Sequence, residues 1–224
     1  MAEKRVETIM KAAIFDVDGL LVNSEPTHRE ASRISFAEYG VNRDDLPIEV
    51  ASKVVGLTIK ESVRVMLEAL DASDKFDEIF KRRQEVFLDL IREKAELMPG
   101  ALHALQLCKS KGLKVAAASS GTKEFLELVF TKFDINDYFE VITSADDVIN
   151  SKPDPQIFLI TAKKLRVRPV DCVVFEDADN GVAAAKAAGM KCIAINSPFT
   201  TKQKLDKADI VRTSLEEITE KDVL

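Results

Sequence analysis

Short apolar runs separated by helical patterns constrain the fold of this chain more than any other feature. Between the runs, apolar residues recur at helical spacing in four segments. The alternation predicts an α/β fold with a doubly wound, mostly parallel sheet. The predicted strands are Ala12–Phe15, Lys114–Ala118, Cys172–Phe175 and Lys191–Ile195, with a weaker one at Glu140–Thr143 and an edge strand at Ala208–Val211; the predicted helices are Gly100–Lys111, Lys123–Phe133, Pro155–Leu165 and Gly181–Ala188, with an acidic helix from Ser214.

One long segment, from Pro26 to Leu97, interrupts this alternation. It shows helical patterns at His28–Tyr39, Ile59–Leu70 and Phe76–Lys94, and no convincing strand. We therefore expect an all-helical cap domain at residues 26–95, inserted into an α/β core formed by residues 1–25 and 96–224. An insertion directly after the first strand is well placed to act as a lid, although helices packed against the sheet would give the same pattern.

Charge and cysteine content narrow the range of partners. The formal net charge of −6 argues against a nucleic-acid partner, because such proteins usually carry a basic surface. The three cysteines, Cys108, Cys172 and Cys192, are scattered and indicate neither a zinc site nor a disulfide framework. Met1–Lys11 lacks the apolar core of a secretory signal, and no apolar stretch is long enough to span a membrane. We expect a cytoplasmic protein without a membrane partner.

Two acids follow the first predicted strand, Asp16 and Asp18, and then Gly19. Residues i and i+2 of a strand point to the same side, and open α/β sheets place their active sites at the carboxyl ends of the strands. Two carboxylates held together need a cation or a shared proton. The pattern predicts a divalent metal and acid–base chemistry, while a strand followed by an acidic turn is the alternative.

Polar residues follow three further strands. Ser119, Ser120 and Gly121 end the second strand, where hydroxyls and free N–H groups make either an anion site or a helix N-cap. Lys152 lies on a proline-flanked loop and could neutralise a carboxylate or a phosphoryl group. A second acid pair, Glu176 and Asp177, follows a further strand. These acids could complete a metal site, or they could simply lie at a helix N-terminus, where the helix dipole favours them.

Taken in chain order, an acid pair, a hydroxyl, a lysine and a second acid pair each end a separate strand. With this order the chain resembles the haloacid dehalogenase superfamily, and more narrowly its β-phosphoglucomutase-like branch of phosphatases with a helical cap. The resemblance implies a Rossmann-like core and a Mg²⁺ cofactor. Its most specific motifs are Phe15–Leu21 with Ser24–Pro26, Lys152–Pro155, and Glu176–Asp177 leading to Gly181 and Ala187–Gly189.

The resemblance also implies roles for single residues. Asp16 would be the nucleophile and Asp18 the general acid and base. Ser119, with Ser120 and Gly121, and Lys152 would hold the transferring phosphoryl group. Mg²⁺ would be bound by Asp16, the backbone carbonyl of Asp18 and Asp177, with Glu176 near or in its coordination shell.

Two cap residues are further candidates for contact with the substrate. His28 matches a histidine of mutase-like members by position, and a packing histidine is the alternative. Lys81, followed by Arg82 and Arg83, could supply a basic contact, although such a run is usually a solvated face.

By resemblance, the expected function is Mg²⁺-dependent hydrolysis of a small phosphomonoester, such as a sugar phosphate or nucleoside monophosphate, by a monomer. A sugar phosphomutase is the first alternative. Ile59 stands where the phosphoglucomutases carry a phosphate-gripping arginine after the cap glycine Gly56, which argues against it. A non-catalytic binding protein on the same fold is the second alternative, against which the intact set of site residues argues.

Overall fold

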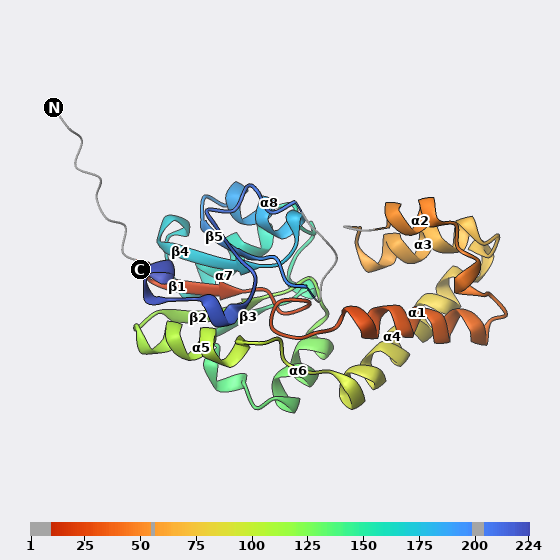
Figure 1. Cartoon of the computed structure of the whole chain (residues 1–224), viewed down its shortest axis with the longest axis horizontal. Coiled ribbons are helices and arrows are strands. Elements are labelled where there is room, and N and C mark those ends of the chain that lie inside the picture. The colour runs from red at the N-terminus through yellow and green to blue at the C-terminus, as the bar shows by residue number, and fades with distance from the viewer. Residues whose placement is uncertain (1–9, 55–56, 199–203) are drawn as a thin grey trace. The chain divides into compact units, whose positions relative to one another are not determined.

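The computed structural model describes residues 10–54, 57–198 and 204–224. The chain forms two compact units, one made of Met1–Val22 with Leu97–Leu224 and the other of Asn23–Glu96. Figure 1 shows the elements of both units in chain order.

The first unit is built on a six-stranded sheet with the strand order β3-β2-β1-β4-β5-β6. Every neighbouring pair is parallel. β1 is central and pairs with β2 on one side and β4 on the other, so the strand order reverses there. The predicted doubly wound, parallel fold is confirmed. The strands are β1 (Ala12–Phe15), β2 (Lys114–Ala118), β3 (Val141–Thr143), β4 (Cys172–Glu176), β5 (Lys191–Ile195) and β6 (Ile210–Arg212).

Helices cover both faces of this sheet. Figure 1 shows α8 on one side and α5 and α6 on the other. The acidic segment after Ser214 forms a 3₁₀ turn, Leu215–Glu217, and a four-residue helix rather than the single helix that was expected, because Thr219 starts a new capping box with Asp222. The helices of this unit are α5 (Ala101–Ser110), α6 (Lys123–Lys132), α7 (Gln156–Leu165), α8 (Asp179–Ala187) and α9 (Glu220–Val223).

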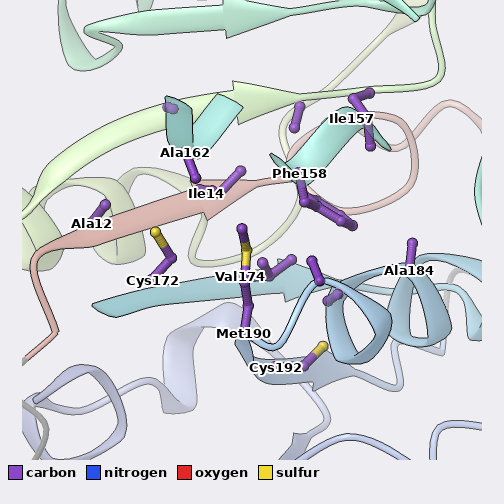
Figure 2. Packing of buried hydrophobic residues seen from close by; sticks show 14 of the residues in the cluster. Ala12, Ile14, Ile157, Phe158, Ala162, Cys172, Val174, Ala184, Met190 and Cys192 are labelled. Atoms are coloured by element: carbon purple, nitrogen blue, oxygen red, sulfur yellow. The ribbon is translucent and has the colours of Figure 1, made fainter. Parts of the chain in front are cut away.

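Side chains on one face of the sheet form the main core together with α7 and α8. Figure 2 shows Ile14 and Val174 of the central strands packed with Phe158 of α7 and Ala184 of α8. The residues on the opposite face, such as Phe15 and its stacked partner Phe175, are also buried. A sheet buried on both faces explains why its strands are continuous apolar runs rather than alternating ones.

Helices are the only regular secondary structure in the described residues of the second unit. It has a small core of its own around Phe36, Val63, Leu67 and Ile79. The predicted helices are confirmed, and α2 is an addition. The helices are α1 (Glu25–Glu38), α2 (Ile48–Lys53), α3 (Ile59–Ala69) and α4 (Phe76–Lys94).

Two further expectations from the sequence concern the arginine position at Ile59 and the absence of a membrane-spanning segment. Gly56, used above to place Ile59, lies outside the described residues, whereas Ile59 itself begins α3. Within the parts of the chain that the structure describes, no helix is both long and apolar enough to cross a bilayer.

Candidate active site

The site begins where β1 ends. The backbone N–H of Asp16 donates to the carbonyl oxygen of Phe175 at 3.0 Å, so the β1–β4 pairing continues up to the aspartate. The Asp16 side chain is buried. A carboxylate fixed at this edge, at the point where the strand order reverses, lies where open α/β sheets bind their ligands.

Lys152, in the segment before α7, connects three neighbouring strand ends. Its Nζ donates to Asp16 Oδ1 at 2.6 Å, to Glu176 Oε1 at 2.5 Å and, more weakly, to the carbonyl of Ala118 at 3.4 Å. Asp16 directly follows β1, Glu176 is the last residue of β4, and Ala118 is the last residue of β2. The lysine and both acids are almost fully buried, so the two ion pairs are little screened by solvent.

A cluster of acids surrounds this lysine. Asp16, Glu176 and Asp177 each offer a carboxylate oxygen, and these oxygens lie within 4.8 Å of one another. One buried lysine cannot neutralise three buried carboxylates, and leaving a buried charge unpaired is costly. Hard oxygen donors with excess negative charge are what a divalent cation such as Mg²⁺ prefers. The residues present therefore fit such a metal.

The pKa shifts have the same physical origin. Burial raises the pKa of Asp16 to about 7, against the opposing effect of Lys152. The pKa of Asp177 is raised well above its ordinary value by burial and by the charges of Glu176 and Asp16. Burial alone would lower the pKa of Lys152, but the two carboxylates raise it, so the lysine stays charged. The buried carboxylates of the cluster repel one another, and a bound cation would offset this repulsion.

The remaining predicted residues of this unit lie at the same edge of the sheet. Asp18 is half-buried in the loop after β1, and its charge helps to raise the pKa of Asp16. Ser119, directly after β2, is buried; its N–H donates to the carbonyl of Thr143 and its Oγ accepts from the N–H of Gly121 at 3.1 Å. Ser120 beside it is exposed.

The other two predicted residues belong to the second unit. The His28 ring, on α1, stacks on Phe87 with centroids 4.2 Å apart, and its Nδ1 lies 2.6 Å from Nη2 of Arg83 on α4. Arginine can only donate, so the hydrogen-bond pattern assigns Nδ1 as the acceptor and places the ring proton on Nε2. Lys81 is exposed.

The expectation of a solvated basic face is wrong for Arg83, which is only 2% exposed. The other two members of the run fit it better, because Lys81 is exposed and Arg82 forms an ion pair with Glu38 at the surface. A signal for the burial of Arg83 was present in the sequence. Ile79, four residues before it, and Phe87, four residues after it, are both buried on the same face of α4.

Comparison with known proteins places this chain in a family. The profile of the family described as haloacid dehalogenase-like hydrolase matches residues 13–195, which include the strand ends described above. The chain belongs to this family.

The sequences of curated relatives align with nearly the whole of this chain. Hexitol phosphatase B of Escherichia coli strain K12 is 36% identical over 217 residues, covering 95% of this chain and 96% of the relative. A phosphorylated carbohydrates phosphatase of Thermotoga maritima is 35% identical over 216 residues, covering 93% and 96%. The crystal structure of CbbY from Rhodobacter sphaeroides in complex with phosphate has a TM-score of 0.82 at 30% identity, covering 93% of this chain and 96% of that one.

Proposed function

We propose that this member of the haloacid dehalogenase-like hydrolases is a Mg²⁺-dependent phosphatase that acts on a small phosphorylated metabolite. The observation that carries the proposal is the contact of Lys152 Nζ with Asp16 Oδ1 at 2.6 Å beside two further buried acids. The arrangement offers a carboxylate nucleophile, a fixed cation and a set of oxygen ligands for a metal. Such a site suits the transfer of a phosphoryl dianion.

In the proposed reaction, an oxygen of Asp16 attacks the phosphorus atom and the bond to the leaving oxygen breaks. Asp18 donates its proton to that oxygen as the alcohol departs, leaving an aspartyl phosphate on Asp16. Asp18 then accepts a proton from the water that attacks this phosphoryl group, and inorganic phosphate and free Asp16 result. Dividing the displacement into two steps is nucleophilic catalysis, with one residue serving as acid and then as base.

The charges of the site determine how the anions can meet. Lys152 and the positively polarised groups around Ser119 and Gly121 would hold the transferring phosphoryl group next to Asp16. Asp16, Asp177 and the backbone carbonyl of Asp18 would hold Mg²⁺, with Glu176 beside them. The metal, when bound, offsets the repulsion between the nucleophile and the phosphate.

The substrate class we propose is a phosphorylated carbohydrate. Two of the relatives named above, from Escherichia coli and Thermotoga maritima, are called phosphatases of hexitols and of phosphorylated carbohydrates, which supports this choice. A nucleoside monophosphate is the second substrate class to test. That the protein is a cytoplasmic monomer without nucleic-acid or membrane partners stays a prediction.

The test is phosphate release from a panel of sugar phosphates, sugar-alcohol phosphates and nucleoside monophosphates, with Mg²⁺ and with EDTA. We expect release that needs Mg²⁺ and that falls by about 10³-fold or more in Asp16→Asn, because the nucleophile is removed. The matched control is Asp137→Asn, at an exposed position of the same unit, which should keep the wild-type rate.

Other outcomes would replace the proposal. Isomerisation of a hexose phosphate that requires a bisphosphate activator would point to the mutase. Binding of phosphorylated ligands without turnover would point to a non-catalytic protein. An Asp16→Asn variant with wild-type turnover would remove Asp16 from the role of nucleophile.

A further inference from the structure

Two glycines of the α/β unit, Gly19 and Gly181, lie against the adjacent acids Asp177 and Glu176 of the candidate site. A Cβ atom on Gly19 would lie 2.5 Å from Oδ2 of Asp177, and a Cβ atom on Gly181 would overlap the carboxyl group of Glu176. Gly19 also has a φ of +90°, so its backbone favours glycine for a second reason. Gly181 lies inside α8 and has no such backbone requirement, so its only distinctive feature is the space that it leaves.

The carboxyl group of Glu176 occupies that space and is held there by hydrogen bonds to Lys152, Asp177 and Ala178. Its Oε2 accepts from the backbone N–H groups of Asp177 at 3.1 Å and Ala178 at 3.3 Å. Its Oε1 accepts from Lys152 Nζ. The Glu176 side chain is 1% exposed, so its carboxylate cannot move outward without losing buried hydrogen bonds.

We propose that Gly181 is a positioning residue whose missing side chain creates the place from which Glu176 holds Lys152 against Asp16. The consequence for turnover rests on the function proposed above, whereas the geometric relation between Gly181 and Glu176 does not.

The position of the Lys152 ammonium group depends on its partners, because the lysine side chain is long and flexible and carries a point charge. Its direction is set by two carboxylates, Asp16 at 2.6 Å and Glu176 at 2.5 Å. If the Glu176 carboxylate is displaced, the ammonium group keeps only one of these two anchors and shifts. An error of about 1 Å in the position of a group at the reacting centre can cost about 10²-fold in rate.

The decisive variant is Gly181→Ala. Alanine suits the interior of α8, so the variant should fold, as circular dichroism would show. We expect kcat to fall by about 10–100-fold with little change in KM, because the orientation of Lys152 matters most while the phosphoryl group is being transferred. Wild-type kcat in a folded Gly181→Ala protein would overturn the proposal.

Gly189→Ala is the matched control. Gly189 follows the same helix, has a φ of +72° and has no atom within 4 Å of the place where a Cβ would stand. Alanine there strains the backbone and should lower the melting temperature while leaving kcat of the folded protein unchanged. Opposite responses of the two variants separate positioning from stability. A kcat lowered equally in both would contradict a specific role for Gly181.

A double-mutant cycle tests the proposed route through Glu176. Glu176→Asp retracts the carboxylate by one methylene, which should lower kcat when residue 181 is glycine. In the Gly181→Ala background the same change should cost less, or restore part of the rate, because the shorter acid no longer overlaps the new methyl group. Additive losses would show that the two residues act independently, and would overturn the proposal.

A second readout keeps this inference apart from the proposed function. If the wild-type protein releases no phosphate, the same cycle is measured by the free energy of unfolding, and a crystal structure of Gly181→Ala shows where the Glu176 carboxylate lies. An unmoved carboxylate and additive unfolding energies would refute the positioning role. A moved carboxylate with coupled energies would support it even if the function proposed above has failed.

Discussion

At the scale of single residues, Arg83 shows how a charge can be accommodated inside a small helical unit. Its guanidinium group meets His28 Nδ1 at 2.6 Å and Gln84 Oε1 at 2.8 Å, and lies over the ring of Phe87. The arginine holds the imidazole in one tautomer, and the stacked phenylalanine fixes the plane of the ring. His28 is therefore held in one orientation by contacts within the helical unit, as the alternative of a packing histidine predicts.

We expect Arg83→Ala to destabilise the protein by about 2 kcal/mol, because it removes buried packing and leaves buried hydrogen-bond acceptors unpaired. Urea unfolding followed by the helical circular dichroism signal measures this loss. Arg82→Ala removes a neighbouring arginine that pairs with Glu38 at the surface, and should change the midpoint little. Equal shifts in the two variants would contradict a structural role for burial at Arg83.

At the scale of elements, the carboxyl ends of β1, β2 and β4 bring the candidate site residues together, and the sequence predicts this arrangement. The apolar run Ala12–Phe15 ends at the acids, and the helical patterns predicted at Lys123–Phe133 and Pro155–Leu165, each between two strands, favour parallel neighbours. The short helix α2 was missed because six residues are too few to show a period.

Within the candidate site, the sequence predicted which residues would lie together but not which of their atoms meet. Glu176 and Lys152 are 24 residues apart, and their ion pair depends on how the segment before α7 lies against the end of β4. The fit of Glu176 against Gly181 is a property of tertiary packing that no local pattern records. The burial of Arg83 was visible as a helical period, although the charge of the surrounding run obscured it.

The C-terminal helix α9 offers an element-scale prediction about acid stability. Asp222 accepts from Thr219 N at 2.9 Å and from Arg212 Nη2 at 2.6 Å. Burial alone would raise its pKa, but these hydrogen bonds bring the pKa below 3.8. An acid with a depressed folded-state pKa stabilises the fold above its unfolded pKa, and that stabilisation is lost as the pH falls through the folded pKa.

Asp222→Asn should therefore cost about 1 kcal/mol of unfolding free energy from pH 5 to pH 8, because it removes the charge while keeping an oxygen at the cap. The difference from wild type should shrink below about pH 4, because the carboxylate of the unfolded chain then takes up a proton while the folded one stays ionised to lower pH. Urea midpoints of both proteins at pH 7 and pH 3 test this. A difference that stays the same at both pH values would mean that the charge of Asp222 is not responsible.

At the scale of the whole molecule, the acid cluster lowers the stability of the metal-free protein and at the same time provides ligands for a cation. Asp16, Glu176 and Asp177 crowd negative charge into the interior with one lysine to balance it. Proteins accept such local costs at functional sites when the rest of the fold is stable enough. The same charge that destabilises the metal-free chain makes it a better host for a cation.

Asp177→Asn should raise the melting temperature in EDTA, because it removes one of the repelling buried carboxylates. It should also lose most of the stabilisation by Mg²⁺, which for a ligand at 100 times its Kd amounts to about 2.7 kcal/mol in a protein that binds it only when folded. Differential scanning calorimetry with and without Mg²⁺ gives both quantities. A variant that is less stable in EDTA, or that keeps the wild-type response to Mg²⁺, would argue against a repulsive metal-binding cluster.

The chain enters and leaves its helical unit through neighbouring segments. The N–H of Asn23 donates to the carbonyl of Glu96 at 3.0 Å, and Val22 forms an antiparallel bridge with Leu97. For the sheet, residues 23–96 are therefore equivalent to the loop of a hairpin, and lengthening a loop whose ends are already fixed costs little entropy. Evolution can exchange this module for one of another size without changing the register of β1 against β2 or β4. The part of the gene that encodes the α/β chemistry and the part that encodes the insertion can thus diversify at independent rates.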